Sequence, residues 1–535
     1  MPNSVQYSET AVSNALGVGD MHVGVPASGP TSTSGFYAGI NPPSGGYTVY
    51  INKASGGPSI VCPANDAALI AFTQNLTGES MADVNACFAY FASETDKMVM
   101  HNPISEMHAA DLSAYYTAGS ILSYPRSGTS WIDISGEAKN GTLTNGPTFS
   151  SNGYFDFDGA DDYVSTGIAL STTTYTKIAW FNPDGATANI ISGGSDGQHA
   201  FWMQNTNTHL RAGHNSTWDR VSYSPGTMTG KWWCGAVTFS TATGWKLYLN
   251  GELVDTSDNT STFSGGTAVR IAAYNNAANL FNGKIATAQI YNKILTAAEI
   301  STNYYQGSIV TDNLEFAVDA GNLVSYQNGS TTVHSLKNVS NEGTLTNGVA
   351  FSSGNGGGWD FDGVDDYITF GTVGSFLSTE FTFELWLNVT DSTSSKENYT
   401  FNYGYSSNSS VLLVSNTSNT GNANLALYYK AAAGGVVGYA LGSYSTDEIV
   451  HLIIRRDSGG LNTAFVNGVS TGTSFSESTT TVLASGLNVQ LGWAIPRNKA
   501  GAYFKGKIYQ FKIYDTALTT SQITQNYNAN VNKFN

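Results

Sequence analysis

With 535 residues, the chain is too long for a single hydrophobic core, and we expect about two to four domains. It has 58 glycines and 12% aromatic residues but only 12% charged residues, a balance typical of β-strands joined by turns. The formal net charge of −16, with no cluster of Lys and Arg, would repel a phosphate backbone and excludes nucleic acid as a partner.

Cysteine usage and hydropathy exclude two further classes of protein. The three cysteines, Cys62, Cys87 and Cys234, leave at least one thiol unpaired, and none forms the closely spaced pairs of zinc sites. Neither a disulfide framework nor a structural zinc site is therefore expected. The initial MPNSVQYSET is polar and no run of about 18 apolar residues occurs, so we expect no membrane insertion, no classical export signal and synthesis in the cytoplasm.

The first part of the chain, residues 1–107, predicts a small α+β module. A Gly/Pro/Ser-rich stretch precedes GYTVYINK at residues 46–53, whose alternation of apolar and polar residues indicates a strand. Two helices are expected after it, one that begins after Asn65 and one that begins after Ser80. The second helix has apolar residues at helical spacing, which predicts a buried face made of Val84, Cys87, Phe88 and Phe91.

The rest of the chain contains two copies of one sequence pattern. The hexapeptide GTLTNG begins at Gly141 and again at Gly343. Near the end of each copy, FNGKIATAQIYNKILTAAEISTNYY aligns without a gap with FKGKIYQFKIYDTALTTSQITQNYN. Because self-similarity at a long period indicates repeated structural units, we predict two homologous domains at residues 108–308 and 309–535.

Alternating apolar and polar residues are frequent within each copy and favour β-strands. In KIYQFKIY, we expect Tyr509, Phe511 and Ile513 on a buried face. Gln510 and Lys512 are expected on the opposite face, in contact with solvent. The pattern therefore predicts a half-buried strand.

Short local signals mark the turns and helices of each copy. Asn-Gly pairs at residues 250–251 and 467–468 lie between alternating runs and predict two-residue hairpin turns. Each copy closes with one short helix, predicted from two capping boxes: Thr296 with Glu299, and Thr519 with Gln522. Many strands and one closing helix per copy predict a mainly all-β fold with two tandem β-sandwiches.

An acidic decapeptide occurs in both copies, as FDFDGADDYV at residues 155–164 and as WDFDGVDDYI at residues 359–368. Aspartates in a tight turn commonly accept hydrogen bonds from backbone amides, and we favour this structural interpretation. Calcium is the alternative, because Ca²⁺ takes about 6–8 oxygen ligands. The candidate calcium ligands are Asp158, Asp161 and Asp162 in the first copy and Asp362, Asp365 and Asp366 in the second.

The sequence contains no catalytic signature in a suitable context. The eight histidines are scattered singly and no HExxH motif occurs, which argues against a metal hydrolase. GVSTG at residues 468–472 fits the G-x-S-x-G pattern, but it follows an Asn-Gly hairpin and opens no helix. We therefore predict no catalytic residue and a protein that is not an enzyme.

Aromatic residues outside the predicted core are candidates for ligand contacts. Sugar-binding surfaces stack pyranose rings on Trp and Tyr, and polar side chains complete recognition. Trp180 and Trp386 occupy equivalent strand positions and are interpreted as structural. The candidates lie near polar, loop-like sequence and have no counterpart in the other copy: Trp202, Trp218 and Tyr223 in the first copy, and Tyr405 and Trp493 in the second.

In each copy, an AG strand that ends in SY is followed by GTLTNG, DFDG with DDY, an Asn-Gly hairpin and a closing helix that ends in NY. This order resembles the LamG-like, concanavalin A-like jelly-roll domains, in the version common in virion structural proteins of marine tailed phages. The resemblance implies two jelly rolls and glycan recognition. Related glucanases carry a Glu-x-Asp-x-x-Glu strand, which this sequence lacks.

The N-terminal segment GYTVYINKASGGPSIVCPANDAALIAF also resembles modules of marine phage structural proteins. This resemblance implies that residues 1–107 attach the chain to other virion proteins. The hypothesis is a non-catalytic virion structural protein, a head or tail fibre or appendage at the virion surface, which displays lectin-like domains for adhesion to glycans or the host surface. It would form a homo-oligomer, with a trimer as the usual state of fibres.

Two alternative functions are compatible with the same sequence. A purely architectural protein would decorate or cement the particle through protein interfaces, without a sugar ligand. A glycan depolymerase would require two carboxylates about 5–10 Å apart in a groove, and the sequence offers no such pair. The fold cannot separate these functions, because one fold serves many of them.

Overall fold

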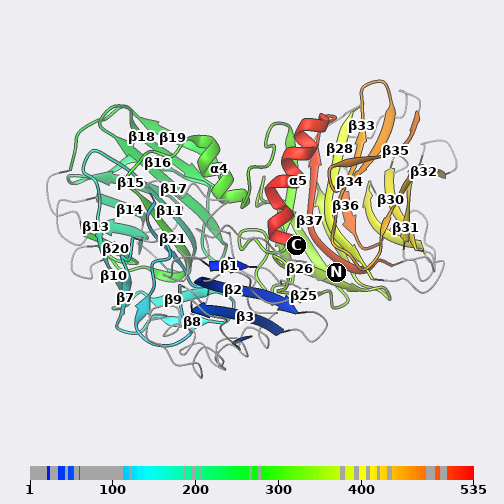
Figure 1. Cartoon of the computed structure of the whole chain (residues 1–535). Helices are drawn as coiled ribbons and strands as arrows, with labels where there is room; N and C mark the ends of the chain where they lie inside the picture. The colour runs from blue at the N-terminus through cyan, green and yellow to red at the C-terminus, as the bar shows by residue number, and fades with distance from the viewer. Residues whose placement is uncertain are drawn as a thin grey trace.

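The computed structural model describes most of residues 112–534 (Figure 1). None of the helices that it describes has the length and apolar content that crossing a membrane requires. Before residue 112 it describes four strands only. Within 112–534 it leaves out residues 121–122, 136, 186–187, 194–198, 205–207, 264–267, 275–278, 374–379, 391–396, 405–409, 418–421, 431–435, 477–487 and 494–502.

The four N-terminal strands form one sheet. Its order is β1 (Met21–Val23), β2 (Ser34–Asn41), β3 (Gly46–Lys53) and β4 (Ser59–Ile60), with β1 parallel to β2 and the other pairs antiparallel. The strand predicted from GYTVYINK is confirmed as β3. The two helices predicted after Asn65 and Ser80, with Cys62 and Cys87, lie outside the described residues.

The first repeat is a sandwich in which one large sheet packs against two smaller sheets. The large sheet has the order β19 (Glu252–Ser257), β18 (Gly244–Leu249), β17 (Trp233–Ser240), β11 (Thr174–Pro183), β21 (Asn282–Tyr291), β9 (Tyr154–Asp158), β8 (Thr148–Ser150), and β5 (Leu112–Thr117) also pairs with β21. One small sheet has the order β13 (Ile191–Gly193), β20 (Ala268–Ile271), β10 (Tyr163–Ala169), β7 (Gly141–Thr144), β6 (Ser130–Trp131). The other has the order β12 (Ala188–Asn189), β14 (His199–Met203), β15 (Leu210–His214), β16 (Thr217–Tyr223).

The second repeat is a sandwich of two large sheets. The first has the order β25 (Ala350–Ser352), β26 (Gly358–Asp362), β37 (Lys505–Tyr514), β28 (Phe381–Val389), β33 (Val450–Arg456), β34 (Leu461–Val466), β35 (Val469–Ser476), and β22 (Leu314–Asp319) also pairs with β37. The second has the order β23 (Thr332–His334), β24 (Glu342–Thr346), β27 (Tyr367–Thr372), β36 (Asn488–Leu491), β29 (Glu397–Tyr403), β30 (Ser410–Thr417), β31 (Asn422–Lys430), β32 (Val436–Ser445). The predicted mainly all-β class with two tandem sandwiches is confirmed.

Alternation along the strands builds the core of each sandwich. In β9, Phe155 and Phe157 are fully buried while Asp156 is half-buried and Asp158 is exposed. The same alternation is found in β26. Both predicted hairpin turns are confirmed, because the Asn and Gly of residues 250–251 and 467–468 all have positive φ, as a two-residue turn of this type requires.

One helix covers the outer face of the large sheet in each repeat, and both helices lie between the two sandwiches (Figure 1). Helix α4 (Ala297–Tyr305) begins with the predicted capping box of Thr296 and Glu299. Helix α5 (Thr520–Phe534) begins after Thr519, whose hydroxyl accepts from the backbone N–H of Gln522 at 3.3 Å. The predicted caps are therefore confirmed.

Helix α5 overturns the prediction of a half-buried strand in KIYQFKIY. Gln510 and Lys512 are buried beneath this helix rather than exposed to solvent. Tyr509 also departs from the expected face, because the pairing of β37 with β28 shifts register near Trp386. Its ring packs against Phe534 of α5, with ring centroids 5.4 Å apart. Polar residues of a strand can thus face a helix when hydrogen bonds satisfy them.

The two repeats share one buried cluster of side chains. It contains residues of both large sheets, of α4 and of α5. Hydrogen bonds cross the junction: Tyr304 OH donates to the Leu336 carbonyl at 2.8 Å, and Asn322 Nδ2 donates to the Tyr304 carbonyl at 2.9 Å. The repeats therefore pack directly on each other.

Candidate functional site

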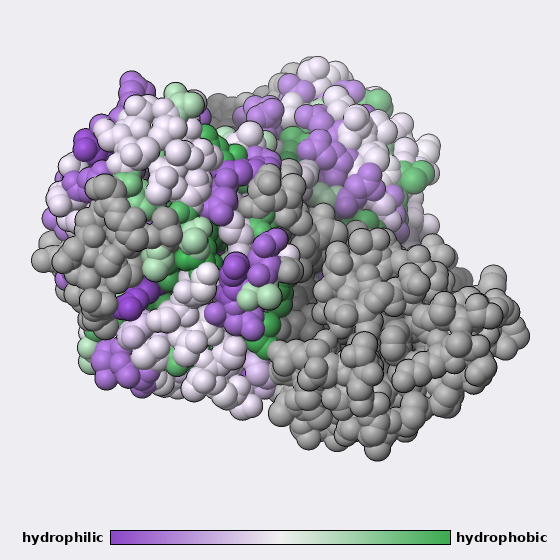
Figure 2. Space-filling model, turned by 60° about the vertical axis from the view of Figure 1, so that its left-hand side comes forward, coloured by the Kyte–Doolittle hydropathy of each residue, from purple (hydrophilic) through white to green (hydrophobic). Residues whose placement is uncertain are grey.

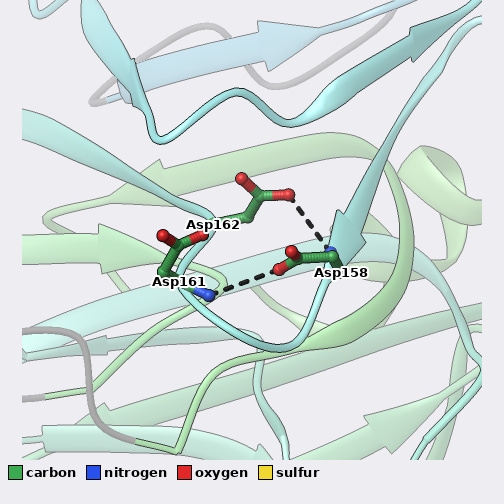
Figure 3. Close-up of side chains that lie close together, drawn as sticks. All are labelled: Asp158, Asp161 and Asp162. Carbon is green, nitrogen blue, oxygen red and sulfur yellow. Dashed lines mark hydrogen bonds between the residues drawn. The ribbon is translucent and has the colours of Figure 1, made fainter.

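The acidic turn of the first repeat uses its aspartates to hold its own backbone (Figure 3). Asp158 Oδ1 accepts from the N–H groups of Ala160 and Asp161 at 2.8 and 3.3 Å, and Asp162 Oδ2 accepts from the N–H of Asp158 at 3.2 Å. The hydrogen bond from Ala160 is the main cause of the lowered pKa of Asp158, whereas burial raises the pKa of Asp162. These hydrogen bonds to backbone amides are those expected of aspartates in a tight turn, the interpretation that we favoured from the sequence.

The acidic turn of the second repeat repeats this geometry with one difference. Asp362 Oδ1 accepts from Val364 N–H at 2.7 Å and Asp366 Oδ2 accepts from Asp362 N–H at 3.0 Å. Burial raises the pKa of Asp366. Its second oxygen, Oδ1, is buried and has no hydrogen-bond partner among the described residues.

Both turns could supply oxygens to a cation. In each turn, one oxygen from each of the three aspartates lies within 4.8 Å of the others. Hard carboxylate oxygens suit Ca²⁺, which tolerates irregular geometry. The unpartnered Asp366 Oδ1 makes the second turn the better fit, because a bound cation would satisfy it.

Next to the acidic turn of the second repeat lie three half-buried aromatic side chains, which we call the aromatic trio: Tyr367, Trp493 and Tyr503. Trp493 stacks on Tyr503 with ring centroids 5.6 Å apart and planes inclined by 13°, and its ring lies 5.3 Å from that of Tyr367. Burial raises the pKa of Tyr503, and the charge of nearby Asp365 adds to the effect. The trio and the carboxylates thus form one rim, which combines stacking surfaces with hydrogen-bond acceptors.

The corresponding rim of the first repeat lacks the trio. The registers of β20 and β36 place Ala273 where the second repeat has Trp493. The alignment of Phe281 with Phe504 places Leu280 where the second repeat has Tyr503. Tyr163 retains the place of Tyr367, but it is covered by Arg270, whose guanidinium carbon lies 4.9 Å from the ring centre.

The aromatic candidates of the first repeat lie in strands, and the expectation that they lie in loops is wrong. Trp202 belongs to β14, whereas Trp218 and Tyr223 belong to β16. The structure brings two of them together, because Trp202 Nε1 donates to the Trp218 carbonyl at 2.6 Å, and Arg211 stacks over the Trp202 ring at 5.7 Å. Tyr223, which is 37% exposed, is the last residue of its strand. Tyr405 lies outside the described residues.

Three aromatic contributors were missed by the sequence analysis. They are Tyr274, which packs edge-on against Trp218 at 5.4 Å, and Tyr367 and Tyr503 of the trio. Tyr367 is the last residue of the DDY motif within the acidic decapeptide, and it could have been found from that motif. Tyr503 lies ten residues after Trp493, just before β37, and no short-range sequence signal connects the two residues.

A hollow of about 390 Å³ lies between the repeats. Equivalent residues of the two copies, Phe149 and Phe351, line it together with Arg126 and Asn152. Arg126 stacks over Phe149 at 5.4 Å, and Asn152 Nδ2 donates to the Asn328 carbonyl at 3.4 Å. The hollow is thus a concave surface with aromatic and polar walls.

Two tandem jelly-roll sandwiches, each with an acidic turn and the second with an aromatic rim beside it, define a lectin-like β-sandwich protein. The chain belongs to the concanavalin A-like lectin/glucanases superfamily, because the Laminin_G_3 family matches residues 158–301 and 361–524, which is more than half of the chain. The predicted LamG-like, concanavalin A-like membership is confirmed. A comparison with curated proteins finds no match.

Three solved structures of carbohydrate-related proteins match parts of the chain. Domain 4 of AbnA, a GH43 extracellular arabinanase from Geobacillus stearothermophilus in complex with arabinotriose, is 20% identical, with 40% of this chain and 97% of that chain covered and a TM-score of 0.30. Ruminococcus gnavus IT-sialidase CBM40 bound to α2,3-sialyllactose is 17% identical (25% and 83% covered, TM-score 0.23). Trypanosoma rangeli sialidase is 14% identical (50% and 43% covered, TM-score 0.30).

Proposed function

We propose that the chain is a non-catalytic glycan-binding protein and that the rim of its second repeat is the binding surface. The observation that supports this proposal is the position of the aromatic trio beside the acidic turn. Trp493 and Tyr503 offer parallel, half-exposed ring faces to the C–H face of a sugar. Asp362 and Asp365 are exposed and can accept hydrogen bonds from sugar hydroxyls or bind them through calcium.

The part of the protein surface that the structure describes suits a polar ligand. Figure 2 shows a face of the molecule on which residues of intermediate hydropathy predominate, with hydrophilic patches and smaller hydrophobic areas between them. Among the described residues, the exposed large hydrophobic side chains are Tyr223, Leu253, Val364 and Val469. A broad protein interface usually has an apolar centre, whereas sugar binding requires only a few aromatic faces.

The finer part of the proposal is that the protein is a structural component of a tailed-phage virion. It rests on the resemblance of residues 46–72 and of the repeats to marine phage structural proteins. In this proposal, residues 1–107 attach a homo-oligomer, a trimer in the case of a fibre, to other virion proteins. The repeats then face outward at the virion surface and adhere to the host.

We propose that the rim binds a sugar without cleaving it, because two of its carboxylates already accept hydrogen bonds from the backbone. Asp362 and Asp366 each direct one oxygen to a backbone N–H of their own turn. A general acid must instead be free to give its proton to the leaving group. The carboxylates of this rim therefore serve to shape the turn and to bind.

A glycan array and a whole-cell adhesion assay with the full chain test the proposed function. Trp493→Ala should lower the affinity for the bound sugar about fivefold, because a lost stacking contact is worth about 1 kcal/mol. Tyr367→Ala should weaken binding too, whereas Tyr163→Ala, at the equivalent position of the first repeat, should not. If no glycan or cell binds, or if the three variants bind alike, the rim is not an adhesion site and the architectural role becomes the better explanation.

A further inference from the structure

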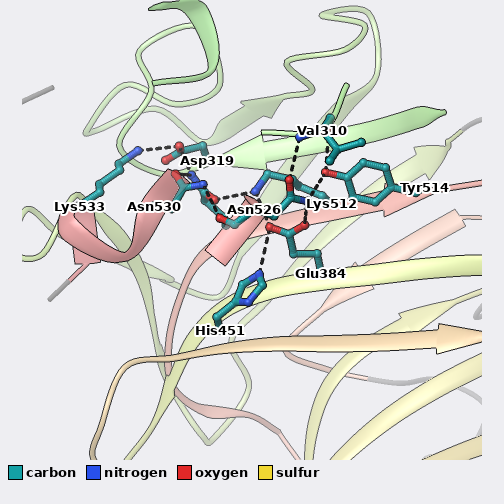
Figure 4. Close-up of polar contacts among 10 residues, drawn as sticks. Val310, Asp319, Glu384, His451, Lys512, Tyr514, Asn526, Asn530 and Lys533 are labelled. Carbon is teal, nitrogen blue, oxygen red and sulfur yellow. Dashed lines mark hydrogen bonds and ion pairs between the residues drawn. The ribbon is translucent and has the colours of Figure 1, made fainter. Parts of the chain in front are cut away.

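The polar groups beneath helix α5 form a connected, buried network (Figure 4). Glu384 on β28 and Lys512 on β37 are directly opposite each other in the sheet, and Lys512 Nζ donates to Glu384 Oε1 at 2.8 Å. Asn526 on α5 donates from Nδ2 to the other carboxylate oxygen at 2.6 Å. The side chain of Glu384 is 0% exposed and that of Lys512 is 4% exposed. One carboxylate therefore joins an amine and an amide out of contact with solvent.

The carbonyl group of Asn526 is held by a separate contact. The backbone N–H of Val310 donates to Asn526 Oδ1 at 2.7 Å, and Asn526 Nδ2 also donates to Tyr514 OH at 2.9 Å. An N–H placed on a carbonyl oxygen stabilises the negative charge that develops there when the carbon is attacked. The network thus contains a nucleophile, a proton carrier and a polarised carbonyl.

We propose that Lys512 Nζ and Asn526 Cγ become joined in an intramolecular isopeptide bond, with Glu384 as the group that transfers protons. First the ammonium group of Lys512 gives a proton to Glu384, which leaves a neutral amine that can act as a nucleophile. The amine attacks Cγ of Asn526, and the oxygen that becomes negative is stabilised by the N–H of Val310.

The second half of the reaction releases the side-chain nitrogen of Asn526. Glu384 carries its proton, and then a proton from the attacking Nζ, to Nδ2. The bond between Cγ and Nδ2 breaks as the new amide forms, and the nitrogen leaves as one ammonium ion. One C–N bond forms and one breaks, so no oxidant, reductant or further reactant is needed.

The Glu384 carboxyl group of the pair is ionised before the reaction begins. Burial on its own would raise the pKa of Glu384, but the charge of Lys512 and the contact with His451, 3.2 Å from Oε1, outweigh burial and lower the pKa to about 2. The neutral amine therefore arises only by proton transfer within the pair. The bond forms once per chain, after the fold has assembled the three side chains.

The first repeat has the amide without its reaction partners. Asn303 on α4 corresponds to Asn526 and likewise contacts a tyrosine hydroxyl, at 3.1 Å. Ile178 and Gln289 pair across β11 and β21 where the second repeat has its acid and its amine. The first repeat cannot form the bond, so the proposal predicts one bond per chain.

The intact mass of the full chain, followed by a peptide map, tests the proposal. We expect a mass about 17 Da below the value that the sequence requires, from loss of one ammonia, and a branched peptide that joins Lys512 to Asn526. Lys512→Arg and Glu384→Gln should restore the full mass. Lys507→Arg, a matched change on the same strand at a half-exposed lysine, should leave the loss unchanged.

Three results would overturn the proposal. The first is a wild-type chain of full mass. The second is a loss of ammonia that maps to a succinimide at an Asn-Gly pair, and the third is a loss of about 18 Da that maps to a bond between Lys533 and Asp319. If Glu384→Gln does not fold, the presence or absence of the branched peptide in the wild-type chain decides the question.

Discussion

The two repeats share a scaffold but bury their titratable side chains in different places. In the first repeat, Lys177 lies between the sheets, where its Nζ contacts His199 Nδ1 at 2.6 Å and donates to the Ile191 carbonyl at 3.0 Å. The equivalent residue of the second repeat is Phe383. The second repeat instead places Glu384 and its partners beneath α5. Alternating apolar residues thus specify the scaffold, while buried charges can move from one face of a sheet to the other.

The energetic consequence differs between the two places. No ion pair of Lys177 is found in the part of the chain that the structure describes, and burial lowers the pKa of both Lys177 and His199 well below their usual values. In the second repeat, before the proposed bond forms, Lys512 and Glu384 neutralise each other. The buried basic groups therefore destabilise the first repeat. In the second repeat the buried charges are paired, and removing one of them would leave the other without its partner.

The largest expected effect comes from breaking the paired network. Lys512→Met leaves Glu384 buried without its nitrogen partner and also prevents the proposed bond, so it should lower the free energy of unfolding of the second repeat by at least about 3–5 kcal/mol. The matched change in the first repeat, Gln289→Met, removes only neutral hydrogen bonds and should cost about 1 kcal/mol. Urea unfolding followed by hydrogen exchange in each repeat measures the stability loss of both variants. Equal losses would contradict the expected difference between the two repeats.

Acid should weaken the first repeat before the second. Burial and the charge of Lys177 lower the pKa of His214 from 6.5 to about 4, and a backbone contact with Ser261 offsets this only in part. Because the unfolded chain takes up the proton at higher pH than the folded chain, the contribution of His214 is complete above pH 6.5 and is lost as the pH falls toward 4. The expected loss is on the order of 3 kcal/mol at most.

Hydrogen exchange in each repeat between pH 7 and pH 4.5 measures this acid sensitivity. His214→Phe should reduce the pH dependence of the first repeat and leave that of the second unchanged. If the variant retains the full pH dependence, another group of the first repeat is responsible.

Replacing the isolated lysine should have the opposite sign. Lys177→Met keeps a similar volume and removes a buried amine, so it should raise the free energy of unfolding of the first repeat by about 1–3 kcal/mol. Chemical denaturation measures the gain. A loss of stability would indicate that the contacts of Lys177 with His199 and with the Ile191 carbonyl stabilise the sheet pair more than burial of the amine costs.

Calcium should give the smallest difference between the repeats. The unpartnered oxygen of Asp366 favours binding in the second turn, and calcium at ten times its Kd should stabilise that repeat by about 1.4 kcal/mol. Asp366→Asn should abolish the shift, and Asp162→Asn should leave most of it. Thermal unfolding with calcium and with a chelator measures the shift, and its absence at millimolar calcium would leave both turns as purely structural elements.

The scaffold was predictable because its signals are local. Alternation in β9, the Asn-Gly turn at residues 250–251 and the Thr296 capping box each depend on residues a few positions apart. The buried state of Lys512 was not predictable, because a polar strand face looks the same whether water or the polar side chains of a helix cover it. The covering residue Asn526 becomes relevant only once α5 is docked.

The candidate site was predictable in part for the same reason. The acidic turns were found with their hydrogen-bonding role, since Asx turns are built within a few residues. Trp493 was named as a ligand candidate, but its stacking partner Tyr503 lies ten positions further along the same connection between β36 and β37, and no short-range sequence signal pairs the two rings. The pairing of Trp202 with Arg211 depends on the register of β14 and β15, which single-residue patterns do not give.

The shared buried cluster at the junction of the repeats has a consequence for binding strength. Contacts such as Tyr304 with Leu336 hold the two sandwiches against each other, so their rims cannot move independently as they would on a flexible linker. If both rims bind, the second contact gains effective concentration only where surface sugars match that fixed separation. In that case, the junction would select for the spacing of the sugars on a surface as well as for their chemistry.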